Sequence, residues 1–459
     1  MTLLHSIYAL VWGYPLLILL MGIGIYLTIA LKGLQFKYLG YALKLGLGLD
    51  KAKEGKGDIS HFQSLMTALA ATVGIGNIAG VATAITIGGL GALFWMWVTA
   101  LIGMITKFAE ALLALKYRTV DERGEMCGGP MYFIEKGLGW KWLALTFAGC
   151  GAIATFGGGN MLQANSVADV MSRVFHFDPL WSGIVTAVLI GLTLLGGIKS
   201  IGKVAAFLVP FMGIIYIGGG LLVLLKFYDR LPSAAWGIFS HAFTGQAAFG
   251  GFAGSTLSMS MQVGISRGLM TSEAGLGTAS IAAAAAKSDV PGRQAMVSMT
   301  GSFLATVVMC TITGLILGVS NLLGQVDGDG RLLTGASLTV AAFQSAFGWG
   351  QYIVSLGLVL FAFTTLLGWS YYGEKCIEYI WGRKIVPFYR LLFSLMIIPG
   401  AILELETVWL ISDIFNGLMA FPNLIGLCAL SGVVITETRL FVKELEAEKK
   451  QKLEAKILV

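Results

Sequence analysis

The chain is dominated by apolar stretches of about 20 residues or more, each long enough to cross a bilayer as a helix. Because lipid offers no hydrogen-bond partners, a spanning segment must satisfy its backbone internally, as a helix does. The composition agrees, since 56% of the 459 residues are hydrophobic, 12% are charged and the mean hydropathy is +0.80. A soluble protein carries about twice that charge. We therefore predict an all-α polytopic membrane protein.

Eleven transmembrane helices are predicted from the positions of these stretches. They cover residues 7–31, 61–88, 91–115, 143–174, 180–197, 203–227, 247–266, 294–319, 338–368, 388–403 and 407–437. The first stretch is longer than the apolar core of a secretory signal, and no basic segment precedes it, so we expect it to be retained as a span.

The cationic residues predict the orientation of these helices, because short cytoplasmic loops concentrate lysine and arginine. With the N-terminus outside and the C-terminus in the cytoplasm, all but five of the 31 lysine and arginine residues fall on the cytoplasmic side. The five others are Lys107, Arg173, Lys226, Arg230 and Arg331. Topology therefore explains the net charge of +6, and the scattered basic residues do not indicate nucleic-acid binding.

The eleven helices divide into one extra N-terminal helix and two sets of five. Because five is odd, the two sets run with opposite topology, and inverted repeats of this kind are typical of secondary transporters. The predicted organisation is an extra transmembrane helix, a first five-helix repeat, a second and inverted five-helix repeat, and a charged cytoplasmic tail. These occupy residues 1–35, 60–230, 245–438 and 439–459.

The first helix of the first repeat contains residues that interrupt a helix. Its sequence AATVGIGNIAGVATAI, residues 70–85, has at its centre Gly74, Gly76 and Asn77. A break in mid-membrane frees backbone N–H and C=O groups, and it is tolerated only where protein or a watery cavity surrounds it. The alternative is that Gly76 and Gly80 merely form a small-residue packing face against another helix.

The first helix of the second repeat contains a similar run of small residues. Its sequence AFGGFAGSTLSMSMQ, residues 248–262, includes Gly250, Gly251 and Gly254. Interruptions at corresponding positions of two inverted halves point to a substrate site. The pair of interruptions therefore favours a binding site over a packing face.

The freed backbone groups of such breaks suit a ligand that carries two opposite charges. N–H groups at the start of a half-helix favour a carboxylate, whereas C=O groups at the end of the other half favour Na⁺ or an ammonium group. A zwitterionic amino acid satisfies both. A nucleotide does not fit the pattern, because GIGNIAG is not GxGxxG and no strand precedes it.

Neutral oxygen atoms near the breaks favour Na⁺ over a proton as the coupling ion, because hard cations prefer oxygen ligands. The candidate oxygens belong to Thr72, Asn77, Thr364 and Thr365. Proton coupling commonly uses an ionisable residue deep in the bundle, and few are present.

The ionisable residues within the predicted spans are Asp169, Lys107, Glu110 and Asp413. Asp169 lies toward an outer helix end, and Lys107 and Glu110 have the i,i+3 spacing of a local pair. Asp413 is the deepest. We interpret it as a polar residue paired with neighbouring helices, and a proton relay stays open as the alternative.

Large and polar side chains near the breaks predict a small pocket. Phe249, Phe252 and Trp369 are placed to close it, although aromatic residues in spanning helices commonly only pack. Trp369 also lies near a helix end, where an interfacial position is the alternative. Asn160 and Gln163 lie in mid-span and either bond neighbouring helices or face a site.

Other function classes find no support in the motifs. The five cysteines form no CxxC, and the four histidines form no HExxH or Cys/His cluster, so no metal chemistry is predicted. No GxSxG motif or pair of catalytic carboxylates indicates an enzyme. A channel would need a continuous polar stripe or a ring of charge, and neither is evident in the sequence.

Five segments together resemble the alanine or glycine:cation symporter family, also called the sodium:alanine symporter family. They follow the family's order between about residues 60 and 380 and read ATVGIGNIAGVATAI, CGGPMYFIEKGLG, FGGGNMLQAN, GISRGLMTSEAGLGTA and LGWSYYGEKC. The resemblance implies the LeuT-like five-plus-five inverted-repeat fold of the amino acid–polyamine–cation superfamily, with one extra N-terminal helix. It also implies a multi-pass protein of a bacterial or archaeal cell membrane.

The resemblance further implies Na⁺-coupled symport of alanine or glycine into the cell by alternating access. Na⁺ is the coupling ion, no other cofactor is implied, and no obligate protein partner is expected. The residues leave amino-acid exchange and proton-coupled symport open as alternatives within the same fold. They do not decide between alanine and glycine.

A set of binding residues follows from the resemblance. The implied substrate contacts are Thr72, Gly74, Gly76, Asn77, Gln163, Phe249, Gly250, Phe252, Thr256, Thr365 and Trp369. By analogy with LeuT-like ion sites, one Na⁺ is expected beside the first broken helix and the threonine pair, and a second near Asn77. The implied Na⁺ ligands are Ala71, Asn77, Thr364 and Thr365.

The segment SRGLMTSEAGLG falls at the cytoplasmic end of its predicted span. Glu273 within it is therefore expected to be a capping or gating residue rather than a ligand. The neighbouring Ser272 is compatible with that role, because serine also caps a helix.

Overall fold

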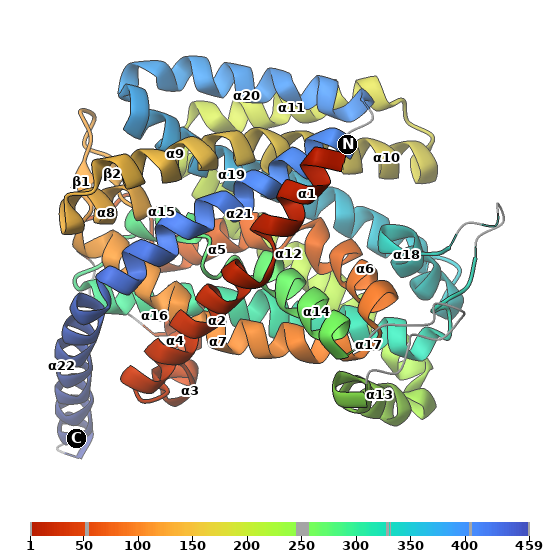
Figure 1. Cartoon of the computed structure of the whole chain (residues 1–459), viewed down its shortest axis with the longest axis horizontal. Helices are drawn as coiled ribbons and strands as arrows, with labels where there is room; N and C mark the ends of the chain where they lie inside the picture. Colours follow the sequence, from red (N-terminus) through yellow and green to blue (C-terminus); the bar gives the residue numbers. More distant parts are fainter. Residues whose placement is uncertain are drawn as a thin grey trace.

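The computed structural model describes residues 2–50, 55–244, 257–326, 330, 332–403 and 406–457. Nearly all of these residues are helical, and the helices pack side by side in one bundle (Figure 1). Within the described ranges, the only sheet is an antiparallel hairpin of β1 (Thr119–Val120) and β2 (Met126–Cys127).

The helices before the first predicted repeat are α1 (Thr2–Val11), α2 (Tyr14–Ala30), α3 (Leu34–Lys37) and α4 (Leu39–Gly46). Those of the first repeat are α5 (His61–Thr72), η1 (Ile75–Asn77), α6 (Ala79–Gly88), α7 (Gly91–Lys116), α8 (Pro130–Leu138), α9 (Lys141–Phe156), η2 (Gly157–Met161), α10 (Leu162–Phe175), α11 (Pro179–Leu195), α12 (Gly197–Lys226), η3 (Tyr228–Arg230) and α13 (Leu231–Thr244).

The second half contains α14 (Leu257–Ser272), α15 (Thr278–Ala284), α16 (Pro291–Ser302), η4 (Phe303–Cys310), α17 (Thr311–Ser320), α18 (Gly335–Ala346), α19 (Gly350–Trp381), η5 (Arg383–Ile385), α20 (Val386–Ile402), α21 (Glu406–Ala429) and α22 (Ser431–Ile457). The segments η2 and η4 are single stretches of π-helix that join α9 to α10 and α16 to α17. Such wide turns are frequent at functional sites.

Eight helices of the described chain are long and apolar enough to cross a membrane. They are Leu3–Ala30, Gly91–Lys116, Lys141–Phe175, Gly197–Lys226, Pro291–Ser320, Gly350–Trp381, Arg383–Ile402 and Thr407–Ala429. Shorter apolar helices cover Ala79–Gly88 and Pro179–Leu195. The prediction of a helical membrane protein is confirmed, whereas the count of eleven spans stays a prediction.

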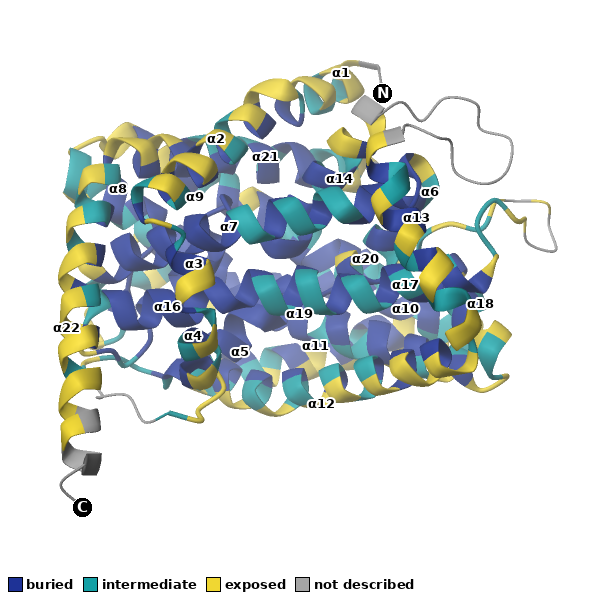
Figure 2. Ribbon diagram, turned by 90° about the horizontal axis from the view of Figure 1, so that it is seen from below, coloured by how far each residue is buried: buried dark blue, intermediate teal, exposed yellow. Residues whose placement is uncertain are grey.

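The outer faces of the bundle are apolar, as a lipid-facing surface requires. Leu192 on α11 is 62% exposed, and Phe207 and Ile214 on α12 are 70% and 72% exposed. Figure 2 shows these two helices with exposed outer faces and buried inner faces. A soluble protein does not expose apolar surface on this scale without a partner.

The elements at the two ends of the bundle differ in charge. In Figure 1, α3, α4, α8, the hairpin and α22 lie at one end, at the left, and α6, α13 and α18 lie at the opposite end. The left-hand elements carry many of the lysine and arginine residues that were assigned to the cytoplasm. The arrangement agrees with the predicted sidedness, and the orientation itself stays a prediction.

Two predicted spans contain helix ends that the sequence did not indicate. Residues 338–368 were expected to form one helix, but α18 ends at Ala346 and α19 begins at Gly350. A Cβ at Gly350 would lie 2.4 Å from the carbonyl oxygen of Phe343, so the tight turn needs glycine there. Residues 407–437 are likewise divided at Leu430 between α21 and α22.

The predicted tail, residues 439–459, is not a separate unit in the described part of the chain. Helix α22 begins at Ser431 and continues to Ile457, well into this charged segment. Figure 1 shows it at a steep angle to α21, along one end of the bundle, where Phe441 and Leu445 are buried. Its sequence becomes charged from Glu437 onward, so it is not suited to remain among apolar helices.

The first helix of the first repeat is broken where the sequence predicted. Helix α5 ends at Thr72, α6 begins at Ala79, and residues 73–78 between them, which we call the first break, form a single 3₁₀ turn. Gly74 lies against α19, because a Cβ there would come within 2.7 Å of the Thr365 hydroxyl. Close approach to another helix explains the need for glycine.

The helix that opens the second half contains a break that the sequence did not predict. Gly250, Gly251 and Gly254, where the break was expected, lie outside the described residues. Helix α14 runs past the predicted end of the 247–266 span and stops at Ser272, and α15 begins at Thr278.

Residues 273–277, which we call the second break, owe their shape to the backbone. Glu273, Gly275 and Gly277 have φ values of +52°, +88° and +81°, a region in which a helix cannot continue and which favours glycine. The structure therefore places a Gly-x-Gly pair in each of the two breaks.

Candidate functional site

A cavity of about 330 Å³ lies between the two breaks. Its wall includes residues 74–76 of the first break, the end of α14, the start of α10 and parts of α19 and α21. Of the predicted site residues, the cavity is lined by Ala71, Thr72, Gly74, Gly76, Gln163, Thr365 and Trp369. Phe249, Gly250, Phe252 and Thr256 lie outside the part of the chain that the structure describes.

The first break presents backbone donors to this cavity. Among the described residues, the N–H groups of Ile75 and Gly76 have no hydrogen-bond acceptor, and both residues line the cavity. The N–H of Gly74 donates instead to Oδ1 of Asn77 at 3.1 Å. Two free N–H groups in the turn that leads into α6 form a concave site that favours an anionic oxygen.

Asn77 lies behind the break rather than in the cavity wall. Its side chain is fully buried, and its Nδ2 donates to the carbonyl oxygen of Ala305 at 2.9 Å. Its own carbonyl oxygen accepts from the Thr313 hydroxyl at 2.9 Å. Asn77 thus ties the first break to the π-helical segment η4 and to α17.

The threonine pair of α19 points in two directions. The Thr365 hydroxyl lies 3.2 Å from the carbonyl oxygen of Ala70 and 2.8 Å from that of Phe361, so it faces the end of α5. The Thr364 hydroxyl lies 3.6 Å from the sulfur of Met212 on α12 and does not line the cavity. The structure therefore brings Thr365, but not Thr364, to the first break.

Gln163 and Trp369 line the cavity from two neighbouring helices, α10 and α19. Nε2 of Gln163 donates to the Gly158 carbonyl at 2.9 Å, and its Oε1 is buried without a partner among the described residues. Trp369 is only 7% exposed and packs on the π-helical segment η2, where a Cβ at Gly159 would lie 2.5 Å from it. Its burial removes the interfacial alternative.

The second break places a carboxylate in the cavity that sequence reasoning assigned elsewhere. Glu273 was expected at a cytoplasmic helix end, but it lines the cavity and is 2% exposed. Its Oε2 lies 3.1 Å from the Thr72 hydroxyl and 3.4 Å from that of Thr278. The missed signal was the Gly275-x-Gly277 pair, which repeats the spacing of Gly74 and Gly76.

The other ionisable residues of the spans differ in environment. Asp169 is exposed and pairs with Arg173 at 2.7 Å. Lys107 and Glu110 are buried on α7, and Glu110 accepts from Nδ2 of Asn423 at 2.7 Å. Neither of these two residues lines the cavity.

Asp413 does line the cavity, on α21, together with Arg267 of α14. The backbone carbonyl of Asp413 accepts from the indole N–H of Trp12 at 2.8 Å, and Trp12 lines the same cavity. The extra N-terminal segment therefore contributes to the cavity wall. No motif around Trp12 indicated this, because its partner lies at the other end of the chain.

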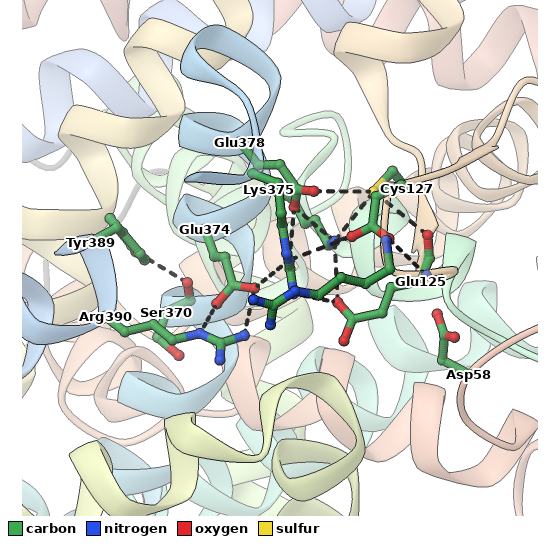
Figure 3. Close-up of polar contacts among 12 residues, drawn as sticks. Asp58, Glu125, Cys127, Ser370, Glu374, Lys375, Glu378, Tyr389 and Arg390 are labelled. Atoms are coloured by element: carbon green, nitrogen blue, oxygen red, sulfur yellow. Dashed lines mark hydrogen bonds and ion pairs between the residues drawn. The ribbon is translucent and has the colours of Figure 1, made fainter. Parts of the chain in front are cut away.

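A network of charged side chains surrounds the C-terminal end of α19 (Figure 3). The Lys375 ammonium lies 2.9 Å from Glu378, 3.9 Å from Glu125 and 4.0 Å from Asp121. It also lies 3.2 Å from the Cys127 sulfur, whose pKa burial raises to about 11, so this contact is to a neutral thiol. Lys375 thereby contacts all three of Asp121, Cys127 and Glu378, whose oxygen and sulfur atoms lie within 4.8 Å of one another.

Two arginines complete this network. Arg383 lies 2.9 Å from Glu125 and 3.2 Å from Glu378. Arg390 binds Glu374 with both oxygens engaged, at 2.6 and 2.9 Å. The network fastens the hairpin to the end of α19 and the start of α20.

The same hairpin region contacts both broken helices at the end that is predicted to be cytoplasmic. The N–H of Met126 donates to Asp58, which precedes α5, at 2.8 Å. The Arg118 guanidinium donates to the carbonyls of Ala284 and Ala286, at the end of α15, at 3.1 and 2.9 Å. In this structure the inner ends of the broken helices are therefore fixed to one loop.

Comparisons with known proteins agree with this architecture. Residues 1–455 match the sodium:alanine symporter family. A sodium/alanine symporter of Methanococcus maripaludis, AgcS, is 53% identical over 96% of this chain and 97% of that protein. A probable sodium/glutamine symporter of Bacillus subtilis, GlnT, is 36% identical over 96% of this chain and 90% of that protein.

A solved structure shows the same fold at low sequence identity. The crystal structure of MhsT in complex with L-phenylalanine covers 84% of this chain and 99% of its own, with a TM-score of 0.58 and 14% identity. This likeness shows the LeuT-like fold. The chain therefore belongs to the sodium:alanine symporter family and is a multi-pass transporter of the cell membrane rather than an enzyme.

Proposed function

We propose that the protein takes up alanine, glycine or both by Na⁺-coupled symport, through alternating access of the cavity between the two breaks. The observation that carries this proposal is the pair of facing breaks, with free N–H groups on one and a carboxylate on the other. The relative named as a sodium/alanine symporter supports the choice of substrate. The proposed topology has eleven spans, the N-terminus outside and the C-terminus in the cytoplasm.

The substrate carboxylate is proposed to bind the N–H groups of Ile75 and Gly76. These groups have no acceptor among the described residues, and a helix start favours negative charge. The contacts expected from sequence remain part of the proposal, including those outside the described residues. They are Thr72, Gly74, Gly76, Asn77, Gln163, Phe249, Gly250, Phe252, Thr256, Thr365 and Trp369.

Na⁺ is proposed to bind beside the first break, where carbonyl and hydroxyl oxygens gather. The Thr365 hydroxyl lies among the Ala70 and Phe361 carbonyls, a neutral oxygen set that suits a hard cation. The full set proposed from sequence is Ala71, Asn77, Thr364 and Thr365. Thr364 and the Asn77 side chain lie away from the cavity, so Thr365 is the side chain that the geometry supports best.

Uptake into proteoliposomes tests the proposed function. We expect uptake of labelled alanine or glycine that depends on an inward Na⁺ gradient and disappears when choline replaces Na⁺. A protonophore serves as control and is expected to leave the initial rate unchanged. Uptake that persists in choline and collapses with the proton gradient would instead establish proton coupling, and uptake that requires internal amino acid would establish exchange.

Trp369 is expected to limit the size of the substrate. Its buried indole fills the cavity beside Gly159, so Trp369→Ala opens space for a larger side chain. We expect larger neutral amino acids to compete with alanine uptake at least about tenfold better than in the wild type, as a few methylene groups of space imply. Trp381→Ala on the same helix is the control, because Trp381 is 65% exposed; equal changes in both variants would contradict the assignment.

A further inference from the structure

The carboxylate of Glu273 is placed for a role that its position in the sequence did not indicate. It is 2% exposed and lines the cavity at the second break, across from the free N–H groups of the first break. The Thr72 and Thr278 hydroxyls both approach Oε2. Both hydrogen bonds that Glu273 accepts from the described residues end on Oε2, and none ends on Oε1.

The charges around Glu273 do not form a closed ion pair with it. Lys107, which is buried on α7 and does not line the cavity, attracts Glu273 electrostatically, but its Nζ has no hydrogen-bond partner among the described residues. Glu110, next to Lys107, is bonded to Asn423. In the cavity wall itself, Arg267 and Asp413 are the other charged side chains of the described chain.

A buried carboxylate with a free oxygen needs a cationic partner, because an uncompensated charge in a low-dielectric site is unfavourable. Thr72 links Glu273 to the last turn of α5, directly before the free N–H groups of Ile75 and Gly76. An anion site and a carboxylate therefore share one small cavity. A ligand with a carboxylate and an ammonium group matches both.

We propose that Glu273 binds the ammonium group of the transported amino acid. This inference rests on the proposed function, since it names the group that recognises one end of the substrate. The Thr72 and Thr278 hydroxyls hold Oε2, and Oε1 accepts from the ammonium. The site then distinguishes an amino acid from a hydroxy acid of the same size by charge rather than by shape.

Lactate is the probe for this inference, because it has a hydroxyl where alanine has its ammonium group. The purified protein is titrated with alanine and with lactate in Na⁺, and both dissociation constants are taken from ligand-induced shifts in melting temperature. We expect the wild type to bind alanine at least about 100-fold more tightly than lactate, as a buried charge pair allows. In Glu273→Gln, alanine binding should weaken to the level of lactate.

Two further variants show whether the effect is specific. Glu110→Gln is the matched control, because Glu110 is equally buried but does not line the cavity, and it should keep the alanine preference. Glu273→Asp retains the charge and should keep part of the preference for alanine over lactate. Stabilisation of Glu273→Gln by Na⁺ alone shows that this variant is folded.

The outcomes separate this inference from the proposed function. A wild type that binds neither alanine nor glycine in Na⁺ would overturn the proposed function. A wild type that binds alanine and lactate equally would overturn the role of Glu273 even if the variants did not fold. A folded Glu273→Gln that keeps the wild-type preference for alanine would overturn it as well.

Discussion

Asn77→Ala is expected to abolish amino-acid uptake while the protein still inserts in the membrane. The amide side chain accepts from the Gly74 N–H and donates to the Ala305 carbonyl. Its removal leaves the Gly74 N–H buried without an acceptor, and such a group costs about 1–3 kcal/mol. The Ala305 carbonyl loses one donor and keeps the Cys310 thiol at 3.4 Å. The first break then has no fixed shape, so the N–H groups of Ile75 and Gly76 lose their position in the cavity wall.

Uptake and membrane content are measured on the same cells, so a loss of transport is separated from a loss of protein. Asn165→Ala is the matched control, because Asn165 also donates to two backbone carbonyls, those of Gly400 and Leu403, but lies outside the cavity wall. We expect this variant to retain most uptake. Wild-type uptake by Asn77→Ala would show that the break does not depend on this side chain.

The first break could be predicted from sequence because its signal is local. Glycines two residues apart, followed by an asparagine, are rare in the middle of an apolar helix, and lipid cannot partner the freed backbone. Asn77 lies within the break, but the direction in which its side chain points could not be predicted. Its partner Ala305 lies 228 residues further along the chain, on a segment that only the fold brings close.

The second break was not predicted from sequence, because the break in this half was expected at the more conspicuous glycines. Gly250, Gly251 and Gly254 interrupt an apolar stretch, whereas Gly275 and Gly277 follow a glutamate and resemble the end of a span. Hydropathy alone assigns a buried carboxylate to the membrane surface. Glu273 is buried because Thr72 and Thr278 surround it, and those contacts exist only in the folded chain.

The two breaks share a feature that the predicted repeats did not indicate. Each break carries a Gly-x-Gly pair beside a polar side chain, Asn77 in the first and Glu273 in the second. Inverted halves place such residues on opposite sides of one cavity, because each half approaches it from the other direction. One break therefore supplies donors and the other supplies an acceptor, which is the arrangement that a zwitterion needs.

Lys375→Met is expected to destabilise the protein more than any exposed charge substitution. The ammonium is 1% exposed and lies within 4.0 Å of Asp121, Glu125 and Glu378. Without it, the carboxylates of Asp121 and Glu378 stay buried, and Arg383 is the cation that remains within 4.0 Å of them in the described chain. Removing one partner of a buried ion pair costs about 3–5 kcal/mol, and we expect a clear fall in the melting temperature of the purified protein.

Lys141→Met is the control for this experiment, because Lys141 is 71% exposed and its nearest carboxylate, on Glu135, is 4.0 Å away. Exposed pairs of this kind contribute little, so its melting temperature should stay close to that of the wild type. Equal shifts in the two variants would show that the buried network does not stabilise this end of α19.

The same substitution should also loosen the hairpin. Cys127 is 1% exposed beside Lys375, so we expect it to react with a thiol reagent faster in Lys375→Met than in the wild type. The measurement uses a Cys428→Ser background, because Cys428 is exposed. Since Asp58 and Arg118 tie this hairpin region to the inner ends of α5 and α15, release of Cys127 would show that the charge network helps to hold both broken helices closed on this side.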